Sequence, residues 1–205
     1  MVDLREHWNK IYETKSSHQM SWTEEIPTTS LSFVHSFKVA KNAAIIDVGG
    51  GESRFVDYLL ALGYTNITVL DISEQALKKT QQRLGSLAMR VKWIVADVNE
   101  VSLPEKYDVW HDRATFHFLV SPYDITNYTN LAAENIKSGG FMTIGTFSES
   151  GPDMCSGLEA KRYSEEDLEQ TLTRRFRKLG CRNEDHYTPS KALQRFLFCS
   201  FQKAA

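Results

Sequence analysis

The stretch from Ala43 to Ser53 reads AAIIDVGGGES, and it joins an apolar run to a helical pattern through three consecutive glycines. The residues from Ala44 to Val48 have the composition of a buried strand that carries one acid, Asp47, near its end. Helical spacing follows from Phe55 to Leu62. Glycines at such a turn let a ligand approach the backbone, and the free N–H groups of the next helix provide polar contacts. The stretch therefore predicts a nucleotide-binding corner of an α/β fold.

The spacing of the glycines separates the cofactor classes that use this corner. A dinucleotide fingerprint requires G-x-G-x-x-G, but Arg54 stands at the position of its third glycine. The dinucleotide form therefore fails. An ordinary tight connection between strand and helix stays open as an alternative for this segment taken alone.

Length and composition favour a single globular domain. The chain has 205 residues, of which 41% are hydrophobic and 24% are charged, and this is enough to bury a sizeable core. The net charge of -2 provides no general attraction to nucleic acids or anionic membranes. We therefore expect neither nucleic acid nor membrane as a partner.

Cysteine usage and the first residues suggest a cellular compartment. The three cysteines are too few and too scattered for a zinc signature or a disulfide framework, so we expect no metal site and a reducing compartment. The N-terminal sequence MVDLREHWNK carries charges where a signal peptide needs apolar residues, and no run reaches the roughly 20 apolar residues of a membrane span. The sequence predicts a cytoplasmic protein.

Acidic residues follow three predicted strands at similar intervals. Asp47 lies at the end of the first, Asp71 follows the strand Asn66 to Leu70, and Asp97 follows the strand Val91 to Ala96. Asp71 comes 20 residues after the glycine turn, where nucleotide-binding α/β folds place a carboxylate that accepts hydrogen bonds from ribose hydroxyls. The alternative for Asp71 is a helix N-cap. The repetition of acids is the strongest evidence for a nucleotide-like ligand.

A fourth strand, predicted from Tyr107 to His111, carries further candidates just beyond its end. Ligands of parallel α/β sheets bind outside the carboxyl ends of the strands. We therefore expect His111, Asp112, Arg113 and His117 to face the site. The alternative is that these residues only order the turn.

The remaining segments are predicted to form a cover over the site and a hairpin. Trp22 lies in a polar loop, where it either packs on the domain edge or belongs to a lid. Cys155 and Arg162 lie in a long loop from Ser148 to Tyr163, which either contacts the substrate or is a mobile connection. Further helices are expected over 4–12, from Pro27, over 74–84, 122–136 and 165–176, and further strands over 141–147, 181–186 and 192–201. The last two strands predict an antiparallel hairpin.

With these motifs assembled, the chain resembles class I S-adenosylmethionine-dependent methyltransferases, whose glycine turn follows an acid at the strand end. The resemblance implies a Rossmann-like, seven-stranded methyltransferase sheet with helices on both faces and a C-terminal antiparallel hairpin. It also implies one domain, with residues 1–42 as an N-terminal helical cap and 43–205 as the core. The implied contacts are the glycines with the methionine part, Asp71 with the ribose, and Asp97 with Val98 at the adenine. The full set implied to bind S-adenosylmethionine is Asp47, Gly49, Gly50, Gly51, Asp71, Ile72, Asp97 and Val98.

The sequence limits the methyl acceptor only to broad chemical classes. The N-terminal HWNKIY and the segment HDRATFHFL look like a bacterial subgroup of these enzymes, and Asp112 to Thr115 is more distantly similar to lysine methyltransferases related to citrate synthase lysine methyltransferase. The residues that follow, Phe116 to Phe118, differ from that pattern. A small-molecule acceptor, such as a thiol, is the first hypothesis, protein lysine is the second, and a catalytically inactive cofactor-binding module is the third. The predicted substrate contacts are Trp22, Arg113, Cys155, Arg162 and His186.

Methyl transfer from a sulfonium is an in-line displacement that requires alignment and an unprotonated nucleophile. A base is needed only if the acceptor is protonated at neutral pH. Either His117 or His186 could accept the proton, with His117 as the predicted base, and Asp112 is predicted to orient the histidine or a cationic acceptor. For a histidine between Phe116 and Phe118, the alternative is a packing role.

Overall fold

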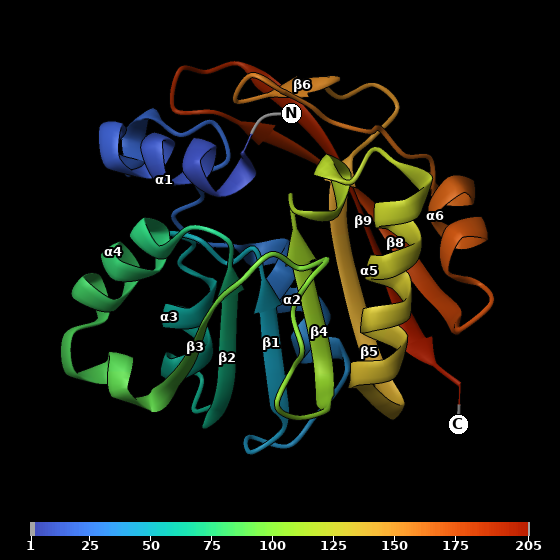
Figure 1. Cartoon of the computed structure of the whole chain (residues 1–205). Coiled ribbons are helices and arrows are strands. Elements are labelled where there is room, and N and C mark those ends of the chain that lie inside the picture. Colours follow the sequence, from blue (N-terminus) through green and yellow to red (C-terminus); the bar gives the residue numbers. More distant parts are fainter. Residues whose placement is uncertain (1–2, 205) are drawn as a thin grey trace.

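The computed structural model describes residues 3–204, which form a central seven-stranded sheet (Figure 1). Its strands are β1 Ala44–Val48, β2 Asn66–Asp71, β3 Val91–Val95, β4 Tyr107–Arg113, β5 Ile136–Phe147, β8 Phe176–Tyr187 and β9 Leu193–Lys203. Their order across the sheet is β3-β2-β1-β4-β5-β9-β8. The pairs from β3 to β5 are parallel, whereas β9 pairs antiparallel with both β5 and β8. The predicted sheet and its closing hairpin are confirmed.

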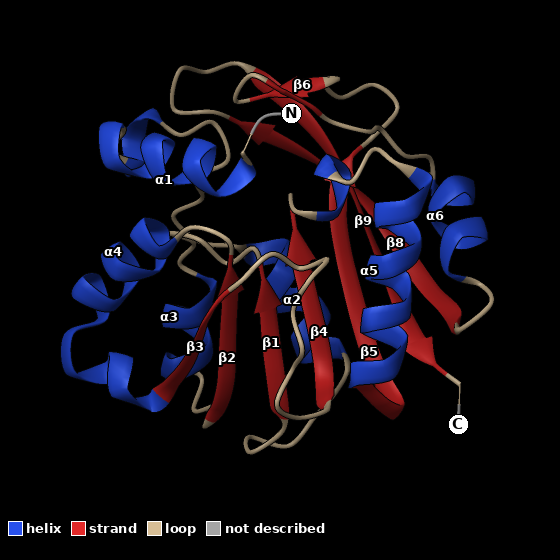
Figure 2. Ribbon diagram, viewed as in Figure 1, coloured by secondary structure: helices blue, strands red, loops and turns tan. Residues whose placement is uncertain are grey.

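Helices cover both faces of this sheet, as Figure 2 shows. They are α1 Leu4–Thr14, α2 Thr28–Ser36, α3 Phe55–Ala61, α4 Glu74–Leu84, α5 Pro122–Asn135 and α6 Glu165–Leu172, with short 3₁₀ turns at η1 Ser17–Gln19, η2 Gly85–Arg90 and η3 Phe116–Phe118. One buried cluster joins α5 and α6 to the sheet, and another joins α2, α3 and α4 to its other face. The helix α1 lies beyond the carboxyl ends of the parallel strands (Figure 1).

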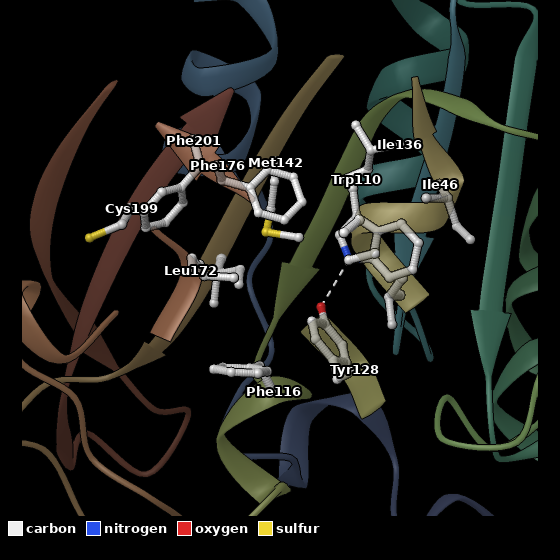
Figure 3. Packing of buried hydrophobic residues seen from close by; sticks show 14 of the residues in the cluster. Ile46, Trp110, Phe116, Tyr128, Ile136, Met142, Leu172, Phe176, Cys199 and Phe201 are labelled. Carbon is white, nitrogen blue, oxygen red and sulfur yellow. Dashed lines mark hydrogen bonds between the residues drawn. The ribbon is translucent and has the colours of Figure 1, made fainter. Parts of the chain in front are cut away.

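The parallel strands are buried because helices cover both of their faces. Every residue of β1 is buried, which explains why all of its residues except Asp47 are apolar. Figure 3 shows the cluster between the sheet and α5, where Trp110 Nε1 donates a hydrogen bond of 2.9 Å to Tyr128 Oη. A buried tryptophan N–H needs such a partner, so this bond fixes how α5 packs on β4.

Two strand boundaries differ from the sequence prediction. β4 continues to Arg113, so Asp112 and Arg113 lie within the strand instead of beyond its end. β5 begins at Ile136, and the glycines expected to end the preceding helix lie inside the strand. Between Tyr107 and Val109 the register with β5 shifts, and Gly139 has a φ of 74°. Glycine accommodates such a bulge, so the strand starts earlier than a glycine signal suggests.

The C-terminal third contains two further differences. The helix α6 ends at Leu172, short of the predicted Phe176, and the predicted long loop contains a small hairpin of β6 Met154–Cys155 and β7 Leu158–Glu159. The expectation that the cysteines form no disulfide is wrong, because Cys181 and Cys199 are bonded across β8 and β9. These two residues are direct neighbours in the hairpin register, which spacing along the chain does not reveal. Cysteine usage therefore no longer supports a reducing compartment.

Among residues 3–204, no helix is both long enough and apolar enough to span a bilayer.

Candidate active site

The glycine turn after β1 has a backbone that only glycine adopts readily. Gly49 has a φ of 65° and Gly51 a φ of 48°. A Cβ atom added to Gly49 would lie 1.6 Å from Thr115 Oγ1, so the close approach of η3 also requires glycine there. The hydroxyl of Thr80 donates a hydrogen bond of 2.8 Å to the Gly51 carbonyl, which holds the turn against α4. The turn is therefore fixed by its neighbours.

A cavity opens at the carboxyl ends of β1, β2, β3 and β4, beside this turn. The helix α1 and the loop that carries Trp22 close it from above, with residues of β5, β6 and β9 at one side. Its lining consists of Leu4, Trp8, Tyr12, Trp22, Val48, Gly49, Leu70, Asp71, Ile72, Ala96, Asp97, Val98, Asn99, Arg113, Ala114, Thr115, Phe118, Leu119, Phe147, Cys155 and Phe196.

Asp71 is the buried acid that faces this cavity. Asp71 is the last residue of β2 and is only 7% exposed. Burial raises the pKa of the Asp71 carboxyl to about 7, although hydrogen bonds from the backbone N–H groups of Ser73 and Gly51 act in the opposite direction. The hydroxyl of Ser73 accepts from the Ala76 N–H at 3.2 Å and so caps α4 itself. Asp71 is therefore not required as the cap of that helix.

The end of β3 provides a second polar edge of the cavity. Asp97, Val98 and Asn99 line it, and Ile72 lines it after β2. The Asp97 Oδ1 atom accepts a hydrogen bond of 2.8 Å from the Asn99 N–H, while the Oδ1 atom of Asn99 is buried and has no partner among the described residues. An unsatisfied amide oxygen and a carboxylate thus lie beside apolar side chains.

Asp47 does not line the cavity, contrary to the sequence prediction. Its Oδ1 atom lies 2.7 Å from His111 Nδ1, and His111 Nε2 lies 2.8 Å from the hydroxyl of Ser30. Asp47 and His111 are direct neighbours in the register of β1 and β4, so their side chains emerge on the same face. The buried row from Asp47 to Ser30 joins β1 and β4 to α2. His111, also expected at the site, belongs to this row.

Gly50 and Gly51 also lie outside the lining, since only Gly49 of the three glycines contributes to it. A Cβ atom on Gly50 would meet Val69 and Asp47, and one on Gly51 would meet the hydroxyl of Tyr12. These two glycines are required by close packing around the turn.

Asp112 is fully buried and does not line the cavity, contrary to its predicted catalytic role. Its Oδ2 atom accepts a hydrogen bond of 2.6 Å from Tyr128 Oη, and its Oδ1 atom accepts from the N–H groups of Thr115 and Phe116. Burial raises the pKa of the Asp112 carboxyl to about 6, which these hydrogen bonds partly offset. The residue orders the turn after β4, which is the alternative that the sequence left open.

His117 is likewise buried and absent from the lining, so the structure does not support it as the base. Its Nδ1 atom accepts a hydrogen bond of 3.3 Å from the Phe147 N–H, and its ring stacks on that of Phe147. The accepting Nδ1 assigns the proton to Nε2, which leaves no nitrogen lone pair for a substrate. Burial, reinforced by Arg113, lowers the pKa of His117 to about 3. The histidine is therefore a neutral packing residue.

The five predicted substrate contacts divide into two groups. Trp22, Arg113 and Cys155 line the cavity. Arg162 is exposed and donates to the Glu149 carbonyl at 3.2 Å, and His186 lies 2.6 Å from the Ser21 carbonyl, outside the cavity. His186 therefore holds the loop that presents Trp22, instead of contacting a ligand in the cavity.

Aromatic side chains form a wall that the sequence indicated only in part. Trp8 of α1 packs edge-on against Trp22 at 5.7 Å and Phe118 at 5.2 Å between ring centroids. Trp8 and Tyr12 are four residues apart on α1, and this spacing predicts that they share one face of the helix. Phe147 and Phe196 join the wall because they pair across β5 and β9, which no local signal reveals. Phe116, which the sequence also suggests for an aromatic cover with Trp8, Tyr12, Trp22 and Phe118, lies in the core instead.

Comparison with known sequences identifies the domain. Residues 45–140 match the family model described as a methyltransferase domain. Malonyl-[acyl-carrier protein] O-methyltransferase of Anoxybacillus flavithermus is 34% identical over 127 residues, which cover 59% of this chain and 47% of that protein. The chain spans about half the length of the curated relatives it matches.

Two solved structures share the fold along 98% of the chain. One, solved for the conversion of a disulfide bond into a thioacetal group during echinomycin biosynthesis, has a TM-score of 0.78 and 16% identity, with 93% of that chain covered. The other is Burkholderia thailandensis 1,6-didemethyltoxoflavin-N1-methyltransferase, solved with 1,6-didemethyltoxoflavin and S-adenosylhomocysteine, with a TM-score of 0.72, 20% identity and 88% of that chain covered. Residues 45–140 therefore match a methyltransferase domain, and the chain as a whole has the Rossmann-like fold that these two structures share.

Proposed function

We propose that the protein transfers a methyl group from S-adenosylmethionine to a small-molecule acceptor. The observation that carries this proposal is the buried Asp71 carboxylate, which faces the cavity beside the glycine turn. A desolvated carboxylate in a cavity gains from a ligand that donates hydrogen bonds, and two neighbouring ribose hydroxyls provide such donors.

The rest of the lining fits the other parts of this cofactor. Ile72 and Val98 offer apolar surfaces for an adenine ring, and Asp97 with Asn99 offers oxygen acceptors at its polar edge. Gly49 lines the cavity at the turn, beside the space proposed for the methionine part. When bound, S-adenosylmethionine supplies an electrophilic methyl group on a sulfonium.

The chain itself contributes alignment and exclusion of water. The aromatic wall of Trp8, Trp22 and Phe118 covers the cavity, which favours a desolvated, ordered acceptor. Asp112 and His117, the predicted catalytic pair, are buried elsewhere and hydrogen-bonded to the fold. The proposed reaction therefore requires an acceptor atom that is already unprotonated at neutral pH, or that loses its proton without help from these two groups.

A small acceptor is favoured by the cover over the cavity. Residues 1–42, the proposed cap, supply Leu4, Trp8, Tyr12 and Trp22 to the lining. Hydrogen bonds from Ser73 Oγ and the Gln75 N–H to Asn9 Oδ1, at 2.8 and 3.4 Å, tie this cap to α4. A protein side chain would have to enter past this tethered helix, which makes the lysine alternative the less favoured of the two.

The test is a calorimetric titration of the whole chain with S-adenosylmethionine and, separately, with NAD, followed by a methyl-transfer screen. The screen covers small carboxylic acids, thiols, heteroaromatic amines and lysine-containing proteins. We expect binding of S-adenosylmethionine alone and turnover of a small molecule. Labelling of proteins only would support the lysine alternative, and a lack of S-adenosylmethionine binding would overturn the proposal.

A further inference from the structure

The cavity has a second half, formed by the ends of β4, β5 and β9 together with α1, that the proposed cofactor contacts do not use. Aromatic side chains dominate this half: Trp8, Trp22, Phe118, Phe147 and Phe196. Arg113, the last residue of β4, is the one cation among the described residues that line the cavity. An apolar compartment with a single cation is suited to a ligand that is mostly apolar and carries one negative charge.

The guanidinium of Arg113 is held firmly but incompletely satisfied. Nη1 donates a hydrogen bond of 2.9 Å to the Trp22 carbonyl, and Nε lies 3.1 Å from Glu24 Oε2. The central carbon lies 4.7 Å from the centroid of the Phe196 ring, which supports the cation from one face. The side chain is only 10% exposed, and both Nε and Nη2 are buried without a hydrogen-bond partner among residues 3–204, although Nε has the Glu24 carboxylate as an ion-pair neighbour.

A buried N–H donor without an acceptor is unfavourable, so the unsatisfied Nη2 marks where a ligand oxygen belongs. Guanidinium groups bind carboxylates more strongly than neutral carbonyls, because the hydrogen bond is charge-assisted on both sides. Burial, together with the neighbouring carboxyl of Glu184, raises the pKa of the Glu24 carboxyl to about 7, so Glu24 is only partly ionised near neutral pH. An anionic oxygen group is therefore the ligand group that completes this site.

We infer that the acceptor is a small molecule with a flat, apolar body and a carboxylate, and that the carboxylate binds Nη2 of Arg113. The aromatic side chains pack against the apolar body, and Arg113 sets its orientation and the choice of acceptor. This inference rests on the proposed function, since it names the acceptor class for the same cavity.

The experiment compares 1-naphthoate with 1-naphthamide, which have the same body and differ in charge. Each is titrated by calorimetry into the whole chain in the presence of saturating S-adenosylhomocysteine. We expect the carboxylate to bind at least about tenfold more tightly than the amide, in line with a charge-assisted hydrogen bond. Arg113→Met removes this preference, whereas Arg174→Met, which changes an exposed arginine, preserves it.

Removal of Arg113 leaves Glu24 buried without its cation, so Arg113→Met is examined alongside Glu24→Gln/Arg113→Met, which removes both charges. Arg113→Lys retains a cation without the guanidinium fork, and we expect it to keep only part of the preference. S-Adenosylmethionine binding by each variant is measured in parallel, so that a variant that does not fold is recognised.

Equal affinity of the wild-type protein for acid and amide, or binding of neither, overturns the inference. So does a preference that survives in Arg113→Met. Wild-type protein that binds S-adenosylmethionine without a carboxylate preference contradicts only this inference, whereas wild-type protein that does not bind S-adenosylmethionine contradicts the proposed function itself.

Discussion

At the scale of single residues, the cavity depends on one acid. Asp71 is 7% exposed, faces the cavity and already accepts a hydrogen bond of 2.7 Å from the Ser73 N–H. The backbone N–H of Gly51 also donates to this carboxyl, so a ligand would add to two hydrogen bonds that the fold already provides.

Asp71→Ala is expected to weaken S-adenosylmethionine binding about 10- to 100-fold, because a hydrogen bond to a charged group contributes about 1.5–3 kcal/mol. The measurement is the dissociation constant by calorimetry. Asp153→Ala is the control, since Asp153 is exposed and lies outside the lining. Unchanged affinity in Asp71→Ala would remove the ribose assignment.

The raised pKa of Asp71, about 7, also predicts how cofactor binding depends on pH. Hydroxyl donors bind the ionised carboxylate, so a proton competes with the cofactor below the pKa. Affinity should therefore fall as pH falls from 8 to 6, approaching about tenfold per pH unit below the pKa. In Asp71→Asn, this pH dependence of the affinity should disappear. If wild type and Asp71→Asn show the same slope, the pH dependence does not come from Asp71.

At the scale of elements, a buried polar row connects three of them. Ser30 of α2, His111 of β4 and Asp47 of β1 are each at most 2% exposed and lie in hydrogen-bond contact. The row positions the glycine turn relative to the cap, although none of its three members lines the cavity.

His111→Leu should destabilise the protein by about 3–5 kcal/mol, because it leaves the Asp47 carboxylate buried without its partner. The measurement is the free energy of unfolding in urea. Ser30→Ala is the matched variant, and its cost should be smaller, about 1 kcal/mol, since it removes one neutral partner. If both variants lower the free energy of unfolding by the same small amount, the row contributes little to stability.

At the scale of the whole molecule, burial of acids makes stability depend on pH. The pKa of Asp112 is raised to about 6 in the folded protein, above the value of about 4 in an unfolded chain. The folded state then binds the proton more tightly, so the contribution of Asp112 to stability is largest at low pH. It declines as pH rises through about 4 to 6.

Asp112→Asn removes this titration. Its free energy of unfolding relative to wild type should therefore improve by about 2–3 kcal/mol between pH 4 and pH 7. Urea unfolding of both proteins across this range provides the test. A constant difference between the two proteins would contradict the raised pKa.

Much of the fold was predictable from the sequence because its signals are local. Apolar spacing and glycine placement predict the strand β1, the glycine turn and the helix from Glu74 to Leu84. The residue type at the start of α6 likewise predicts that Ser164 caps that helix. The boundaries of β4 and β5 did not follow, because a bulge at Gly139 depends on the partner strand. The Cys181–Cys199 bond depended on register in the same way.

Local signals in the chain were enough to predict the fold class and the end of the sheet at which the cavity lies, since acids after parallel strands share one edge. Which of these side chains reach the cavity depended on how distant segments pack together. Asp47 and Asp71 occupy similar places in the chain, yet the register of β1 with β4 directs Asp47 to His111, and Asp71 faces the ligand space. The aromatic wall and the unsatisfied Nη2 of Arg113 likewise exist only once distant segments meet, because packing and burial are not properties of local sequence.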